Sequence, residues 1–78
     1  EINEAFSAVP LHAMQALGLD SARVNVRGGA LALGHPLGAT GIRLAGTLAR
    51  ILHAEGGRFG CAAACIGGGQ GIAMLVER

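Results

Sequence analysis

Three short segments place polar or reactive side chains in otherwise apolar, glycine-rich surroundings. They are residues 3–6 (Asn-Glu-Ala-Phe), 34–36 (Gly-His-Pro) and 65–71 (Cys-Ile-Gly-Gly-Gly-Gln-Gly). An imidazole can take up and return a proton, and a thiol can act as a nucleophile or as an acid–base group. Backbone N–H groups of successive glycines can donate hydrogen bonds to an oxyanion. Together the segments contain the residue types of an enzyme active site, and each residue also has a purely structural interpretation.

His35 lies between Gly34 and Pro36, at the entrance to a strong helical pattern. Two interpretations are open from this residue alone: a structural histidine bonded to a backbone carbonyl, or a catalytic base. The dipole at a helix N-terminus favours the neutral imidazole, which can accept a proton. The glycine-rich setting favours the catalytic interpretation.

Cys61 and Cys65 both fall in a predicted strand over residues 59–66. Their Cα atoms would lie about 13 Å apart at a rise of about 3.3 Å per residue, which is too far for a disulfide. Reduced cysteines suit the cytoplasm or another reducing intracellular compartment. Cys65 is either a small buried apolar side chain or a thiol delivered to a site beside the N–H groups of the following glycines. Cys61 precedes no such loop and is expected to be structural.

Asn3 and Glu4 open a helical pattern over residues 4–17. On local grounds Asn3 is expected to cap this helix through its side-chain oxygen, and Glu4 to complement the dipole of the first turn. Pro10 allows a kink or a late helix start, and Gly18 fits the C-terminal cap.

The remaining elements follow from periodicity and glycine placement. Residues 24–26 give a short strand signal, and residues 37–55 give the strongest helix, ended by Gly56. A stripe of small residues along this helix suits close backbone packing, and its nearly all-round apolar character predicts a buried helix. Strands over 59–66 and 72–76, joined by glycines, predict a hairpin. The order indicates a mixed α/β layer.

Composition narrows the function class. The 78 residues are 51% hydrophobic, contain 14 Gly and are only 14% charged, so much of the surface is expected to be covered by more chain or by a partner. A net charge of +1 gives no sign of the basic surface that nucleic-acid binding requires, and no apolar run is long enough to span a membrane. No paired Cys-x-x-Cys spacing supports a metal site, and the glycines match neither a dinucleotide fingerprint nor a phosphate-binding loop. The chain begins at Glu1 without Met, which also suggests a fragment.

Taken in order, residues 3–6, 24–30, 34–41 (Gly-His-Pro-Leu-Gly-Ala-Thr-Gly) and 65–69 resemble the C-terminal catalytic part of the thiolase family. Each motif alone is weak, but four in this order cover nearly the whole chain. The resemblance implies the layered αβαβα thiolase fold, with a mixed sheet and a buried Gly/Ala-rich helix. Residues 1–78 are then expected to be a fragment of the C-terminal domain, without the N-terminal half that carries the nucleophile.

The resemblance also implies acyl transfer between coenzyme A thioesters, by Claisen condensation or by thiolysis of 3-ketoacyl-CoA. His35 resembles the base that activates the nucleophilic cysteine, and Cys65 the second cysteine, which moves the α-proton. Asn3 resembles the residue that holds a water which, with His35, stabilises the enolate oxygen. The N–H of Gly67 resembles part of the other oxyanion hole. Ala5 and Phe6 are expected to line the acyl pocket.

No tightly bound cofactor and no metal are implied, only coenzyme A thioesters as substrates. The expected partners are the N-terminal half of the same enzyme and further copies, in a homodimer or tetramer. Ketoacyl synthases share a similar Gly-His-x-x-Gly run, and sterol-carrier-type thiolases share the longer motif. Both tend to lack a cysteine at the position of Cys65, which favours a thiolase. A truncated, non-catalytic association module is the other open alternative, and the isolated chain is expected to be inactive.

Overall fold

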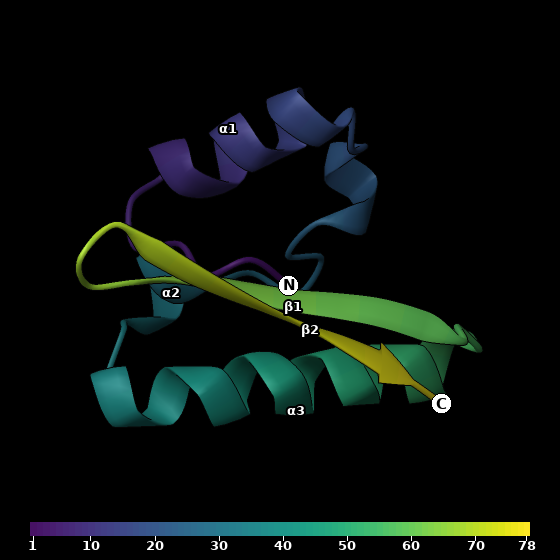
Figure 1. The fold of residues 1–78 in the computed structure, drawn as a ribbon. Helices are drawn as coiled ribbons and strands as arrows, with labels where there is room; N and C mark the ends of the chain where they lie inside the picture. Colours follow the sequence, from purple (N-terminus) through teal and green to yellow (C-terminus); the bar gives the residue numbers. More distant parts are fainter.

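The structure, a computed structural model, describes all 78 residues. Its elements are α1 (Ala8–Leu17), a short 3-10 turn (Ser21–Arg23), α2 (Ala30–Leu33), α3 (Leu37–Glu55), β1 (Phe59–Ile66) and β2 (Gln70–Glu77). The two strands form a hairpin with α1 on one side and α3 on the other (Figure 1). No helix is both long enough and apolar enough to cross a membrane.

The expected mixed sheet is not found within these residues: the sheet is a two-stranded antiparallel hairpin, and its only parallel partner is an isolated bridge between Ile2 and Ala63. β1 pairs with β2 in antiparallel register, from Phe59 opposite Glu77 to Ile66 opposite Gln70. On the other edge of β1, residues 1–3 run parallel to it: the amino nitrogen of Glu1 donates to the carbonyl of Cys61 at 2.9 Å, and the amide of Asn3 donates to Ala63 at 2.8 Å. This pairing fixes the start of the chain against the strand that carries Cys65.

The core lies between α3 and the sheet. Leu44, Leu48 and Leu52 recur at four-residue spacing, so they form one ridge of α3, and they pack on Ala62. Gly60 allows this close approach, because a Cβ at that position would lie 2.6 Å from Leu48 Cδ1. α3 therefore packs directly against β1 through this row of leucines.

Several expectations are confirmed. The helix over 37–55 and the hairpin occur where predicted, and both cysteines are free. Gly18 and Gly56 end their helices with φ of 63° and 70°. The expectation that α3 is buried on all sides is not met in this 78-residue structure. α3 buries only one face, and Leu37 and Ile42 are 83% and 78% exposed.

Two local predictions are wrong, and one helix was missed. The first helix begins at Ala8 rather than residue 4, so Asn3 does not cap it, and Glu4 lies outside its first turn. Residues 24–26 form no strand, because Asn25 adopts a left-handed φ of 50°. The apolar residues 30–33, left unassigned by the sequence, form α2. In the two wrong predictions, the backbone pairing of Asn3 with Ala63 and the turn at Asn25 outweigh the local pattern.

Candidate active site

Asn3 is the most enclosed candidate residue, with an exposed fraction of 1%. Its amide is paired with Ala63, which places it beside β1 two residues before Cys65. The side-chain oxygen Oδ1 is buried and has no hydrogen-bond partner. Buried polar atoms are nearly always paired, since leaving one unpaired costs about 1–3 kcal/mol. Asn3 therefore presents an unused acceptor in the interior of this end of the molecule.

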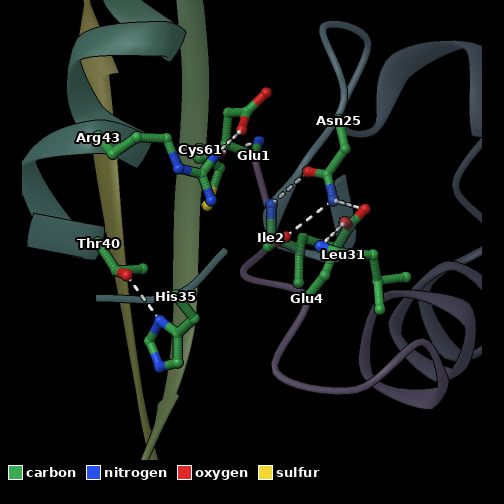
Figure 2. Close-up of polar contacts among 9 residues, drawn as sticks. All are labelled: Glu1, Ile2, Glu4, Asn25, Leu31, His35, Thr40, Arg43 and Cys61. Carbon is green, nitrogen blue, oxygen red and sulfur yellow. Dashed lines mark hydrogen bonds and ion pairs between the residues drawn. The ribbon is translucent and has the colours of Figure 1, made fainter. Parts of the chain in front are cut away.

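Asn25 holds the segment that carries Asn3. Its Oδ1 accepts from the Ile2 amide at 2.7 Å, and its Nδ2 donates to the Ile2 carbonyl at 2.8 Å (Figure 2). A side-chain amide has the same donor and acceptor as a peptide group. Asn25 therefore substitutes for a neighbouring strand, and residues 1–3 are hydrogen-bonded on both edges.

Glu4 connects this segment to the chain leading to His35. Its carboxylate accepts from Asn25 Nδ2 at 3.0 Å and from the amide of Leu31, in α2, at 3.1 Å. It also lies against Gly29, where a Cβ would come within 2.4 Å of the carboxylate. Asn25 and Glu4 were not identified as site residues from the sequence. Both lie in segments that the sequence singled out, residues 3–6 and 24–30, and Asn25, a poor strand former between two valines, was a further signal.

His35 lies in the exposed loop between α2 and α3, two residues before α3 begins. Its Nδ1 is 2.6 Å from Oγ1 of Thr40, in the first turns of α3 (Figure 2). Thr40 is buried, with 5% exposed, and its hydroxyl donates to the carbonyl of Pro36 at 3.2 Å. The imidazole is thus fixed through Nδ1, and Nε2 remains available.

Cys65 and Gly67 lie at the turn of the hairpin. Cys65 is exposed and pairs with Gly71, and Gly67 opens the turn over residues 67–69. Gly68 and Gly69 have φ of 78° and 72°, a conformation that favours glycine. Glycine is therefore required in this turn by its backbone geometry.

An open apolar hollow of about 410 Å³ lies beside Cys65, between α1 and the hairpin. Ile2, Val9 and Ala13 line one side of it, and residues of β1 and β2 line the other. Ala5 and Phe6 do not line this hollow: Ala5 is half-buried, and Phe6 is 74% exposed.

Glu1 and Arg43 form a largely buried ion pair that joins residues 1–3 to α3. Arg43 Nη1 lies 3.2 Å from Glu1 Oε2, and the Glu1 side chain is 1% exposed. Truncating one partner of such a pair leaves an uncompensated buried charge. The pair therefore helps to keep the segment that precedes Asn3 against α3.

The three segments singled out in the sequence lie at one end of the molecule. In Figure 1 the start of α1, the start of α3 and the hairpin turn are all on the left. Asn3 and Cys65 are linked through the backbone of β1, and His35 is linked to α3 through Thr40. No hydrogen bond joins the side chains of Asn3, His35 and Cys65 to one another.

Comparison with known proteins gives the family. The family model described as "Thiolase, C-terminal domain" matches residues 1–78. Over the whole chain the sequence is 58% identical to the cytosolic acetyl-CoA acetyltransferase of Rattus norvegicus and 55% identical to the acetyl-CoA acetyltransferase of Escherichia coli. In each case it covers 20% of the relative, so the chain spans about a fifth of the length of these proteins. The crystal structure of human mitochondrial 3-ketoacyl-CoA thiolase superposes on this chain with a TM-score of 0.93 and 47% sequence identity. The match covers 97% of this chain and 19% of the thiolase chain.

Proposed function

The chain belongs to the thiolase family and carries its C-terminal domain, and from this premise we propose that it is part of an acyl-transferring enzyme. The reaction is acyl transfer between coenzyme A thioesters, by Claisen condensation or its reverse, thiolysis. The observation that carries the proposal is Asn3: it is buried, paired to β1 two residues before Cys65, and has an unpartnered Oδ1.

In this proposal His35 is the base that activates a nucleophilic cysteine supplied by the remainder of the protein. Removing the thiol proton generates a thiolate, the reactive form of cysteine. The thiolate attacks a thioester carbonyl, the bond from that carbon to the coenzyme A sulfur breaks, and an acyl-enzyme forms. Coenzyme A leaves as its thiol with the proton of Cys65, which becomes a thiolate, while His35 keeps the proton it has taken up. Fixation of the ring through Nδ1, with Nε2 free, supports this role.

Cys65 then moves the proton at carbon. As a thiolate it removes the α-proton of the second thioester, and the resulting enolate attacks the acyl-enzyme carbonyl. A carbon–carbon bond forms as the bond to the nucleophilic sulfur breaks, and the 3-ketoacyl thioester is released. Exposure of Cys65 at the hairpin turn supports a thiol that meets substrate.

Two oxyanions need stabilisation along this path. A water that donates one hydrogen to Asn3 Oδ1 can donate its other hydrogen to the enolate oxygen, and His35 Nε2–H can supply a second donor after the ring has gained its proton. The amide of Gly67 is assigned to the acyl-enzyme carbonyl. Preorganised donors of this kind are worth about 2.7–4 kcal/mol each in related oxyanion holes.

Ala5 and Phe6 are assigned to the acyl pocket, which the rest of the enzyme would complete. The exposed apolar side chains of α3 and β2, including Ile42 and Leu75, support covering by the N-terminal half and by further copies in a homodimer or tetramer. Coenzyme A thioesters are the substrates, with no tightly bound cofactor. The proposed location is the cytoplasm or another reducing compartment, where the thiols stay free.

The test uses the longer enzyme with acetyl-CoA, acetoacetyl-CoA and longer 3-ketoacyl-CoA substrates. Cys65→Ala should still form the acyl-enzyme, seen as an added acyl mass, but should form no carbon–carbon bond. His35→Ala should impair both steps. Condensation at the normal rate in Cys65→Ala would refute its role, and a wild-type protein that is never acylated would favour a non-catalytic association module.

A further inference from the structure

The contact between His35 and Thr40 determines more than the position of the ring. Thr40 Oγ1 is 2.6 Å from His35 Nδ1, and the same hydroxyl donates to the carbonyl of Pro36 at 3.2 Å. A hydroxyl has one proton but two lone pairs. When the hydroxyl proton is directed to Pro36, the oxygen is left to accept from His35, and Nδ1 then carries the hydrogen.

The position of the proton decides which nitrogen of His35 is basic. In a neutral imidazole one nitrogen is a donor and the other an acceptor, and the hydrogen bond of one fixes the state of the other. With the hydrogen on Nδ1, the lone pair is on Nε2. In the opposite tautomer the hydroxyl would have to turn its proton to the ring, and its bond to Pro36 would be lost.

The same arrangement accommodates the protonated ring. Both nitrogens of an imidazolium are donors, so Nδ1 must still donate after Nε2 has taken up a proton. Thr40 needs no rotation in this step, because its hydroxyl already accepts from Nδ1. It is also 5% exposed and lies in the regular helix α3, so its own position is well defined.

We propose that Thr40 is a positioning residue that holds His35 in the Nδ1–H tautomer and directs the basic Nε2 toward the reacting groups. The inference rests on the proposed function for its catalytic consequence, while the tautomer itself is independent of any activity. Thr40 acts through His35 and is not assigned a contact with substrate.

The experiment compares Thr40→Val, which keeps the shape and removes the hydroxyl, with Thr40→Ser, which keeps the hydroxyl. Thr47→Val, a half-buried threonine of the same helix with no assigned role, is the matched control. All are made in the longer enzyme. Thiolysis of acetoacetyl-CoA gives kcat and KM, and nitrogen-15 NMR of labelled histidine gives the tautomer of His35 at a pH where the ring is neutral. The His35 signal is assigned by its loss in His35→Gln.

Thr40→Val is expected to lower kcat about 10- to 100-fold, the range found when partners that orient metal-bound histidines are removed, with little change in KM. Thr40→Ser, which keeps the hydroxyl, and Thr47→Val, which does not touch His35, should keep a kcat close to that of the wild type. The wild-type spectrum should show a protonated Nδ1 and an unprotonated Nε2, and Thr40→Val should lose this preference.

A wild-type ring protonated on Nε2 overturns the inference, whether or not Thr40→Val folds. So does a folded Thr40→Val enzyme with normal kcat, or one in which Thr47→Val is impaired equally. Failure of the proposed function looks different: the wild-type enzyme would transfer no acyl group, while the tautomer could still be read from its spectrum.

Discussion

Replacing Gly29 with alanine tests the packing that holds the Asn3 segment in place. Gly29 is buried, and its backbone is extended, with φ of −157°, so alanine brings no strain of its own. The new Cβ would, however, lie 2.4 Å from both Cδ and Oε1 of Glu4. Real Cβ atoms do not come this close to a carboxylate, so one of the two must move.

The structure can relieve this clash in two ways, and the way that loses less free energy determines the destabilisation. If Glu4 stays, the backbone around residue 29 must shift, and such overpacking costs about 1–3 kcal/mol. If the carboxylate moves away, its part-buried bond to Asn25 is lost, and a hydrogen bond to a charged group contributes about 1.5–3 kcal/mol. The bond to Leu31 adds little, because that amide is exposed and water can replace the carboxylate. We therefore expect a loss of about 2 kcal/mol in the free energy of unfolding.

The assay is urea unfolding of four proteins: the wild type, Gly29→Ala, Glu4→Ala and the double variant. Since Glu4→Ala removes the obstructing atoms, Gly29→Ala should cost less than about 0.5 kcal/mol in that background, giving a coupling of about 1.5 kcal/mol. Gly46→Ala, where a Cβ meets nothing within 4 Å, is the control and should cause no loss. An equal cost of Gly29→Ala in both backgrounds would refute the reasoning.

Two further substitutions probe the core and the hairpin turn. Leu48→Ala should lower the free energy of unfolding by about 2–5 kcal/mol, because Leu48 is 7% exposed in the core, whereas Leu17→Ala at a 71% exposed position should change it little; equal urea midpoints would contradict this. Gly68→Ala should cost about 1–2 kcal/mol, because φ is 78° there, and Gly67→Ala, where φ is not positive, should cost less; thermal melting of both variants gives the comparison.

Sequence patterns predicted the elements whose signals are local. α3 runs from Leu37 to Glu55, directly after Pro36 and directly before Gly56, and the sequence predicted the same bounds from the apolar periodicity and the C-terminal glycine. The hairpin follows from two apolar runs separated by glycines. The second strand, β2, is longer than the expected residues 72–76, because Gln70 and Gly71 also pair with β1.

The errors come from residues whose partners are distant in sequence. Asn25 was expected in a strand, but its side chain pairs with Ile2, 23 residues away, and this pairing is made from a left-handed backbone. Asn3 was expected to cap a helix, and its amide instead pairs with Ala63. Local propensity contains no information on such partners.

The candidate site was predicted unevenly for the same reason. His35 and Cys65 were chosen from their motifs, and the structure places their loops at one end of the molecule. Their catalytic roles stay predictions until the variants are measured. Thr40 was noted only as part of a motif, because its contact with His35 depends on how the loop before α3 folds back.

The pairing of residues 1–3 with β1 also has a consequence for when the site forms. Glu1 and its partner Cys61 are 60 residues apart in sequence. At synthesis rates of about 5–20 residues per second, the first segment waits about 3–12 s for its partner strand. Contacts of such separation also form late in folding, because a long loop must close first. Asn3 can therefore be paired only after β1 has been synthesised, and we expect the candidate site to be among the last parts of this chain to form.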